Sequence, residues 1–428
     1  MIFSKLIYLI GCRKRNPSLI PIYRQLKESE GWTREQLKDL QLQKLKKLVK
    51  LAYENTSYYR KLFDQNKIKI DDIKQLSDMQ KIPILEKKDI LSNLELIRNY
   101  KCNNVFYSET SGSTGEPMVF YRNEEWDSAG RAAQMRGYSW YGINPWDRNG
   151  YLWGHIYGSN FEFKTRLLDG FINRFRLFSY NEEAVKSFVK KLQNADYLEG
   201  YSSMIYEIAK IINEHNLGPI SLKMIKGTSE KIYDSYQPEV IKAFGRKMIS
   251  EYGSGESTLI AYECPYGNMH VVMENVIVEE ENGEIIVTNL NSFSMPIIRY
   301  KLGDSITLNT VKKCKCGMEH EIIDDVLGRV GQTILGKKGK YPSLTLYYIF
   351  KSFAMKYHGA INYQGIQEEK GKLDLLLDKD VLEEEMNAIQ KECNNYFGRD
   401  MEVKIIPNGL VRDYSKKFKD FVSKIGSK

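Results

Sequence analysis

The sequence predicts an α/β protein, α+β overall, in which a large domain combines a helical layer with a mostly parallel sheet and a small α+β domain follows. From about Glu116, short β-rich runs alternate with helix-length segments, which favours parallel strands covered by helices. The first hundred residues instead follow helical periods. The 428 residues are enough to bury one large core and a smaller second one.

The helical layer is expected in residues 1–100. Thr33 and Gln36 form a capping-box pattern in front of a leucine-rich helix, and Asn55 and Ser57 interrupt that helix. The strands of the parallel region are expected at five β-rich runs, namely 118–121, 151–153, 197–199, 224–226 and 248–251.

An antiparallel region and a small second domain are expected further along the chain. Between Val276 and Leu290 two alternating runs flank Asn282-Gly283, which is a strong hairpin signal. We expect residues 1–329 to form the large domain and residues 330–428 to form a small mobile α+β domain. Its elements are expected to be a strand at 373–377, a helix at 382–396 and a strand at 403–406.

The positive charge of the chain is concentrated near its start. The net charge is +8, and residues 1–100 hold 21 lysines and arginines against 12 acidic residues. Leucines at helical spacing, with lysines between them, indicate a solvated helix face rather than a basic stripe with aromatics, so we expect no nucleic-acid partner. These leucines are Leu37, Leu40, Leu45, Leu48 and Leu51.

The stretch from Met1 to Cys12 is apolar but is interrupted by Lys5, and it is too short to cross a bilayer. Because Arg13, Lys14 and Arg15 follow it, the stretch could lie on an anionic membrane surface as an interfacial helix. The favoured alternative is a first helix packed on the body. The stretch has no small-residue cleavage site of the kind that ends a signal peptide.

The six cysteines are too few and too scattered for a disulfide framework, which fits a reducing cytoplasm.

A hydroxyl-rich and glycine-rich segment, Ser108 to Pro117, resembles a phosphate cradle. Such a turn can present backbone N–H groups and hydroxyl donors to phosphate oxygens, and its glycines permit close approach. It is not a Walker A loop, because no Gly-Lys-Ser/Thr triplet is present. The candidate phosphate-binding residues are Ser111, Gly112, Ser113, Thr114 and Gly115. The alternative is an ordinary polar turn.

This segment is similar to the Ser/Thr-Gly-Ser/Thr-Thr-Gly-x-Pro loop of adenylate-forming enzymes, which holds the β- and γ-phosphates of ATP. The sequence Glu251 to Glu256 resembles the Tyr-Gly-x-x-Glu element of the same family. The resemblance implies that Tyr252, followed by Gly253, lies against adenine and that Glu256 helps to bind Mg²⁺. A carboxylate suits that ion, which prefers protein oxygens alongside phosphate and water.

Three further segments extend the resemblance. Gly227, Thr228, Ser229 and Glu230 are similar to the segment that packs along adenine, although taken alone they are also consistent with a turn at a strand end. The segment 296–304 resembles the Arg-Tyr-x-x-Gly-Asp element, which implies that Asp304 accepts hydrogen bonds from the ribose hydroxyls. Arg329 follows and is implied to reach the ribose or phosphate.

Near the end of the chain, residues 414–419 resemble the family's Ser-Gly-Lys-Phe-Lys ending, whose lysine bridges the substrate carboxylate and the α-phosphate. This register makes Lys417 the catalytic lysine. The chain departs from the pattern because Lys416 replaces the glycine, so Lys416 itself or a solvated basic tail are the alternatives. Gly331 replaces the usual hinge aspartate, and glycine still permits domain rotation.

The resemblance is to the phenylacetate–CoA ligase and CapK-type branch, and it implies the fold of acyl-CoA synthetases. It implies activation of a carboxylic acid by ATP and Mg²⁺ as an acyl-AMP, and transfer of the acyl group to a thiol, for which coenzyme A is expected. The alternatives are amide or ester formation on a sugar or amino-acid acceptor, given the branch's association with surface polysaccharides, and a nucleotide-binding protein without catalysis. We expect a monomer or a homodimer.

Two further candidates are less closely tied to the motifs. Cys264, His270, Cys314 and Cys316 form two clusters around the predicted hairpin, and three thiolates with one imidazole suit a closed structural zinc site. His320 competes with His270 for this role, and unliganded reduced cysteines are the alternative. His155 follows a predicted strand at the edge where open α/β sheets bind ligands, so it is a candidate for the acyl or adenylate pocket. A histidine packed near the core is equally consistent.

Overall fold

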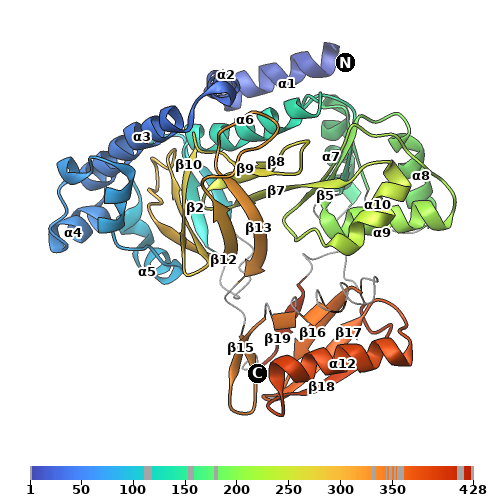
Figure 1. Cartoon of the computed structure of the whole chain (residues 1–428). Helices are drawn as coiled ribbons and strands as arrows, with labels where there is room; N and C mark the ends of the chain where they lie inside the picture. Colours follow the sequence, from blue (N-terminus) through green and yellow to red (C-terminus); the bar gives the residue numbers. More distant parts are fainter. Residues whose placement is uncertain are drawn as a thin grey trace.

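The computed structural model describes residues 2–109, 118–152, 159–177, 182–329, 333–343, 345–346, 349–350, 353, 361–411 and 419–425. Figure 1 shows a large upper body, crossed by helices, and a smaller body below it that contains the last part of the chain. Within the described part of the chain, no helix has the length and apolarity of a transmembrane span.

The first hundred residues form the expected helical layer. Thr33 caps the leucine-rich helix with the expected capping box, in which its side chain accepts from the backbone N–H of Gln36. The helix ends at Asn55 and the next begins at Ser57, as the sequence predicted. The helices are α1 (Ile2–Arg15), α2 (Leu19–Glu28), α3 (Arg34–Asn55), α4 (Ser57–Gln65) and α5 (Lys87–Ile97).

One continuous sheet forms the centre of the large body, and in the described residues it has 11 strands in the order β10-β11-β12-β13-β9-β8-β7-β6-β5-β3-β4. Its parallel half runs from β4 to β7. The strands of this half are β3 (Asn149–Leu152), β4 (Arg174–Arg176), β5 (Tyr197–Tyr201), β6 (Met224–Thr228) and β7 (Met248–Ser254). The helices between and before them are α6 (Glu124–Trp140), α7 (Ser159–Phe171), α8 (Glu182–Leu192), α9 (Ser202–Glu214) and α10 (Gln237–Phe244).

The antiparallel half continues the same sheet from β7. It contains the expected hairpin, whose turn is Asn282-Gly283, with both residues at positive φ. It also contains four strands that the sequence patterns did not indicate, so the antiparallel part is larger than expected. The strands are β8 (Thr258–Glu263), β9 (Met269–Val271), β10 (Val276–Glu281), β11 (Glu284–Asn289), β12 (Tyr300–Asn309) and β13 (Ile322–Arg329).

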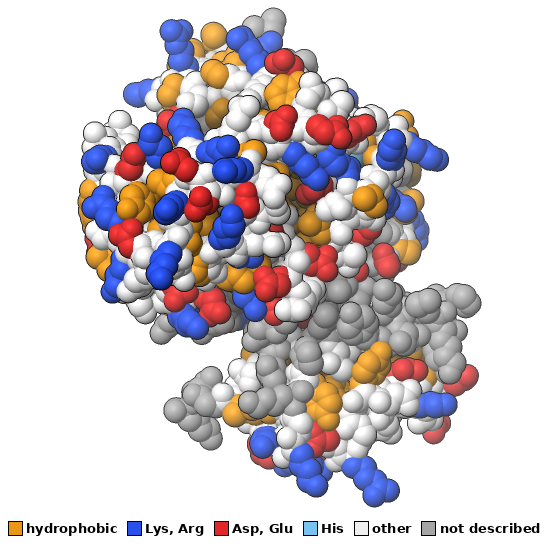
Figure 2. Space-filling model, turned by 60° about the vertical axis from the view of Figure 1, so that its left-hand side comes forward, with side chains coloured by type: hydrophobic (Ala, Val, Ile, Leu, Met, Phe, Trp, Pro, Cys, Tyr) orange, Lys and Arg blue, Asp and Glu red, His pale blue; other side chains and the backbone are white. Residues whose placement is uncertain are grey.

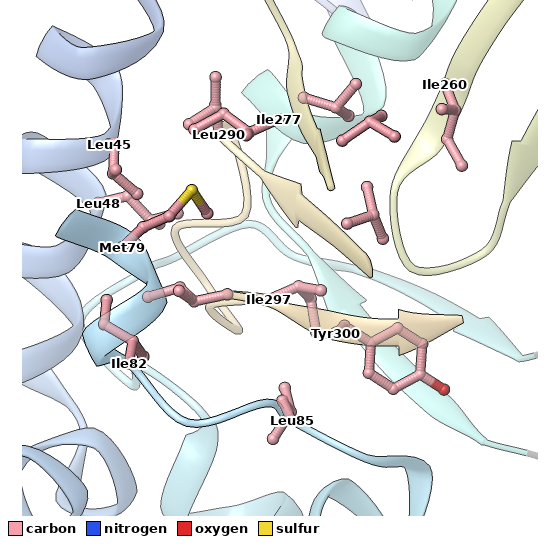
Figure 3. Close-up of a cluster of buried hydrophobic side chains, with 14 of the residues drawn as sticks. Leu45, Leu48, Met79, Ile82, Leu85, Ile260, Ile277, Leu290, Ile297 and Tyr300 are labelled. Atoms are coloured by element: carbon pink, nitrogen blue, oxygen red, sulfur yellow. The ribbon is translucent and has the colours of Figure 1, made fainter. Parts of the chain in front are cut away.

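A single hydrophobic cluster fastens the helical layer to the antiparallel half (Figure 3). Leu85 also joins the two by backbone hydrogen bonds, because its N–H donates to Arg299 O at 2.9 Å and its O accepts from Lys301 N at 2.9 Å. The start of β12 is thereby held in place. The labelled residues of the cluster are Leu45, Leu48, Met79, Ile82, Leu85, Ile260, Ile277, Leu290, Ile297 and Tyr300.

The smaller body has a four-stranded sheet in the order β18-β17-β16-β19 and a helix, α12 (Glu383–Phe397). Its hydrophobic cluster draws only on residues from Ile334 onward, which supports the division at 329/330 that we propose. Its strands are β14 (Thr333–Leu335), β15 (Lys340–Pro342), β16 (Tyr363–Gln367), β17 (Lys372–Leu377), β18 (Glu402–Ile406) and β19 (Phe421–Ser423).

Candidate active site

A cleft of about 2490 Å³ runs along β6 and β7 and includes their carboxyl ends. In open α/β sheets this is the edge at which ligands bind. Several of the site residues expected from the sequence line this cleft together, although they come from strands far apart in the chain: Thr228, Ser229, Glu230, Tyr252, Gly253, Glu256 and Asp304.

The side chains of Tyr252 and Asp304, which both line the cleft, are hydrogen-bonded to each other. The Tyr252 hydroxyl, on β7, donates to Asp304 Oδ2, on β12, at 2.7 Å. In the sheet, the backbone of Asp304 is paired with that of Arg329 on β13. The structure therefore brings together the three residues that the sequence assigned to adenine and ribose, while the Arg329 side chain lies outside the described residues.

The segment after β6 is held tightly against α9. The backbone N–H of Ser203 donates to Glu230 Oε2 at 3.0 Å, and the Ser202 hydroxyl donates to the Glu230 carbonyl at 3.2 Å. A Cβ on Gly227 would lie 2.5 Å from Ser202 Oγ and 2.8 Å from Met248 Sδ, so only glycine fits there. The carboxylate of Glu230 is thus bonded to the start of a helix, where the helix dipole favours negative charge.

Two residues beside the cleft hold a strained backbone. Ser229 has φ of 63° and Thr258 has φ of 64°. A left-handed conformation is unusual for any residue with a Cβ and more so for a β-branched one. Such strain concentrates at functional sites, where the surrounding structure maintains it. Gly253 pairs with Leu259 in the β7–β8 hairpin, and a Cβ on Gly253 would lie 2.3 Å from the Thr258 carbonyl oxygen.

The strands on either side of the hydroxyl-rich segment form an antiparallel pair, here called the hairpin stem. They are β1 (Phe106–Glu109) and β2 (Val119–Arg122), and Glu109 pairs with Val119. The run at 118–121, which was expected in the parallel sheet, therefore belongs to this separate pair. The Arg122 side chain donates to the Ser108 hydroxyl and lines the cleft. Burial lowers the pKa of Arg122, and the carboxylates of Asp127 and Glu256 oppose this change. The stem therefore lies within electrostatic range of Glu256.

Glu256 itself occupies the turn between β7 and β8. It is 8% exposed, and its carbonyl accepts from Asn289 Nδ2 at 3.1 Å. Within the same turn, the Ser257 N–H donates to Ser254 Oγ at 3.2 Å. A carboxylate in a turn that lines the cleft and is fixed by these bonds offers oxygen atoms of the type that Mg²⁺ prefers.

Behind the cleft, a buried charged network joins the central residues of β5, β6 and β7. Lys226 Nζ lies 3.0 Å from Glu199 Oε2 and 2.9 Å from Glu251 Oε2, and it donates to the Tyr138 hydroxyl at 3.2 Å. Burial alone would lower the pKa of Lys226, but the two carboxylates outweigh burial and raise it. Paired charges with these hydrogen bonds remain ionised in the interior. The network fixes the parts of the strands that carry Gly227 and Tyr252.

Several expected residues fall outside the described residues: the phosphate-binding candidates Ser111, Gly112, Ser113, Thr114 and Gly115, the histidine His155, the lysines Lys416 and Lys417, and the hinge glycine Gly331. From Lys419 to Ile425 the chain is described again. Lys419 lines the cleft, and its carbonyl accepts from Gln364 Nε2 at 2.7 Å.

The four residues expected to bind zinc come together in the structure, and one of them, Cys264, also lines the cleft. Their ligand atoms all lie within 4.8 Å of one another. Cys264 Sγ is 3.6 Å from Cys314 Sγ, and Cys316 Sγ is 3.2 Å from His270 Nε2. A tetrahedral zinc site with bonds of ~2.3 Å separates its sulfur ligands by ~3.8 Å, so the donor set fits zinc.

The histidines of this region have different roles. Burial, followed by the influence of His320, lowers the pKa of His270 to about 4, which keeps the imidazole neutral as a ligand must be. His320 instead bonds through Nε2 to Glu274 Oε1 at 2.9 Å, and that carboxylate also accepts from Arg136 at 2.6 Å. The structure therefore places His270, rather than His320, in the cluster.

The sequence patterns did not identify Arg122, Lys226 and Glu251 as contributors to this site. Lys226 and Glu251 stand immediately before Gly227 and Tyr252, inside strands that begin with buried apolar residues. A charged residue in a buried strand, next to a motif at the strand's end, is the signal that could have identified them. Arg122 had no such signal, because its approach to Glu256 depends on the tertiary fold.

Comparison with known proteins connects this geometry to characterised relatives. The chain is 24% identical over 308 residues to Protein CapK of Staphylococcus aureus, which covers 68% of this chain and 67% of that one. It is 23% identical over 334 residues to a phenylacetate–coenzyme A ligase of Thermus thermophilus, with 72% and 74% of the two chains covered. No family model matches the sequence.

Among solved structures, a 2-hydroxyisobutyryl-CoA ligase in the postadenylation state, bound to an acyl-AMP, is similar with a TM-score of 0.72. The match covers 94% of this chain and 92% of the other at 14% sequence identity. At that identity the likeness concerns the fold, and it confirms the expected fold class.

Proposed function

Since the chain belongs to the adenylate-forming superfamily, in the branch of the phenylacetate–CoA ligases and CapK, we propose that it uses ATP to convert a carboxylic acid to an acyl-AMP. The acyl group then passes to an acceptor, for which we propose the thiol of coenzyme A. The enzyme is an ATP-dependent adenylate-forming ligase. The identity of the acid, the acceptor and the residue roles are the parts that we propose.

The hydrogen bond between Tyr252 and Asp304 carries this proposal. It joins the aromatic residue proposed to lie against adenine to the carboxylate proposed to accept the ribose hydroxyls, at 2.7 Å and inside the cleft. The segment at Thr228 to Glu230 lines the same cleft. Arg122 and Glu256 line the same cleft, and the phosphates of a bound nucleotide are proposed to lie near them.

The proposed reaction is an in-line attack of the substrate carboxylate on the α-phosphate, with pyrophosphate as the leaving group. Electrostatic groups placed where charge develops supply most of the rate in such a transfer. Lys417 is proposed to offset the charge that develops at the α-phosphate, and the hydroxyl-rich loop at Ser111 to Gly115 to bind the departing phosphates. Mg²⁺, held by Glu256, would neutralise phosphate charge when it is bound. His155 is proposed to line the acyl or adenylate pocket.

We also propose that Cys264, His270, Cys314 and Cys316 bind one structural zinc ion. The ligand atoms lie within 4.8 Å of one another, and they come from β9 and from the segments that follow β8 and β12. A closed set of four protein ligands leaves no position for an activated water, so the ion would serve to cross-link these segments. Folding would then depend on the metal.

The cellular role is also a proposal. The relative CapK and the free state of all six cysteines are the two observations that support a cytoplasmic ligase of surface-polysaccharide synthesis. Amide or ester formation on a sugar or amino-acid acceptor is the alternative to coenzyme A. Supplying the enzymatically formed acyl-AMP with coenzyme A, an amino sugar or an amino acid distinguishes the acceptors by the product's mass.

The test of the main proposal is acid-dependent exchange of pyrophosphate into ATP, measured with a panel of carboxylic acids. We expect exchange that requires Mg²⁺ and one class of acid. Glu256→Gln should weaken the Mg²⁺ dependence without changing the melting temperature, because it removes one charged ligand from a turn. ATP binding without exchange for any acid would favour the nucleotide-binding protein that lacks catalysis.

A further inference from the structure

Helix α1 has one face that packs on the body. Cys12 is 9% exposed and belongs to a small hydrophobic cluster with Leu19, Met135 and Trp146. The rings of Tyr8 and Trp146 lie 5.6 Å apart, and Lys5 Nζ lies 5.5 Å from the centre of the Trp146 ring. The helix is therefore anchored along its inner face, as the favoured sequence interpretation expected.

The opposite face of α1 is apolar and exposed. Phe3 is 65% exposed, Leu6 is 56% exposed and Ile10 is 60% exposed. Spacings of three and four residues place these side chains on one side of a helix. Single exposed apolar residues need no explanation, but three in a row along one helix face form a continuous stripe.

The charge of α1 has one sign. Lys5, Arg13, Lys14 and Arg15 are exposed, and no acidic residue occurs in residues 2–15. Three of these cations stand in the last turn of the helix. Figure 2 shows hydrophobic and basic side chains side by side at the top of the molecule, the end at which Figure 1 places α1.

We propose that the outer face of α1 docks on an anionic membrane surface. An exposed stripe of Phe, Leu and Ile with Lys and Arg beside it is the composition that lies in a lipid interface, with the apolar side chains below the headgroups and the cations among them. The helix lies in the plane of the surface, because its inner face remains packed on the body through Tyr8 and Cys12.

The charges favour lipid over a second copy of the chain. Two copies that met through the outer face of α1 would bring Arg13 and Lys14 of each copy, and no helix acid, into one interface, and like charges at close range oppose association. An anionic lipid surface instead neutralises those cations. The proposal is independent of the acid that the enzyme activates.

The experiment measures sedimentation of the full-length protein with vesicles of phosphatidylcholine alone and with added phosphatidylglycerol. We expect binding to the anionic vesicles that weakens as salt rises. The variant Phe3→Ser/Leu6→Ser/Ile10→Ser should lose on the order of a hundredfold in partitioning, since each partly covered side chain contributes up to about tenfold. The variant Arg13→Ser/Lys14→Ser should lose about fivefold per charge on anionic vesicles only.

Matched controls distinguish vesicle binding through this face of α1 from nonspecific adsorption. Val311 and Leu382 are 82% and 73% exposed on other surfaces, so Val311→Ser/Leu382→Ser removes exposed apolar area without touching α1. Lys46→Ser/Lys61→Ser removes two exposed cations from α3 and α4. Both should bind vesicles like the wild type. Circular dichroism and the melting temperature should be unchanged in every variant, because all the substituted side chains point to solvent.

Three results would overturn the proposal. The first is a wild-type protein that does not bind anionic vesicles, and the second is α1 variants that bind as well as the controls do. The third is a dimer, seen by light scattering, that the Phe3→Ser/Leu6→Ser/Ile10→Ser variant converts to a monomer, which would assign the stripe to self-association instead.

Discussion

Replacing Tyr252 by Phe should weaken ATP binding about five- to tenfold. The change removes the hydroxyl that donates to Asp304 Oδ2 at 2.7 Å and keeps the ring that is proposed to lie against adenine. A hydrogen bond to a charged group contributes ~1.5–3 kcal/mol, and the loss here is expected to fall just below that range because both residues are half-buried and water can replace the lost donor. A loss of ~1–1.4 kcal/mol corresponds to a five- to tenfold change in Kd.

Calorimetric titration with ATP and Mg²⁺ measures this effect without knowledge of the acid. The wild type, Tyr252→Phe, Asp304→Asn and the double variant together form a double-mutant cycle. If Tyr252 acts by orienting Asp304, the double variant binds ATP no more weakly than Asp304→Asn alone. Effects that add, or an unchanged Kd for Tyr252→Phe, would refute the role that we assign to this hydrogen bond. Tyr252→Ala should lose more, because stacking on a base contributes ~1–3 kcal/mol.

Three other predictions test the remaining parts of the molecule. Lys417→Ala should lower acyl-AMP formation ~10²- to 10³-fold, while conversion of supplied acyl-AMP is retained. If Lys416→Ala shows this selective loss instead, the assignment of the C-terminal motif is shifted by one residue. Metal analysis should find about one zinc ion per chain. The variant Cys314→Ser should lose the ion and have a lower melting temperature. The control variant Cys102→Ser, outside the cluster, should keep the ion and the melting temperature of the wild type. Gly227→Ala should cost ~1–3 kcal/mol in a denaturant titration, because its Cβ would lie 2.5 Å from a neighbouring hydroxyl oxygen.

The sequence predicted those parts of the fold that local patterns determine. The capping box at Thr33, the break at Asn55 and the turn at Asn282-Gly283 are each specified by residues close together in the chain, and all three are confirmed. The four antiparallel strands β8, β9, β12 and β13 were missed. Most of their partners are neighbouring strands in the sequence, and only the pairing of β13 with β9 joins distant segments. They were missed because they do not show the strict alternation that a half-exposed strand would.

In the candidate site, too, the residues of single motifs could be predicted, whereas contacts between distant segments could not. The motifs identified Thr228, Tyr252, Glu256 and Asp304 as members of one site, and these residues line one cleft. The electrostatic approach of Arg122 to Glu256 and the burial of Lys226 between two carboxylates depend on how the strands are ordered in the sheet. No single segment of the sequence contains that order.

The position of Tyr252 on β7, where the parallel half of the sheet meets the antiparallel half, has a consequence for folding. Asp304 is 52 residues further along the chain, on a strand that reaches β7 only through β13, β9 and β8. The pair therefore forms only after both halves have assembled, and a fragment that ends before β12 lacks half of it. Because ATP would bind only the assembled state, it should protect the large body against thermal unfolding, by ~2.7 kcal/mol at a hundred times its Kd. A melting curve recorded with ATP would thus report on the integrity of the whole sheet.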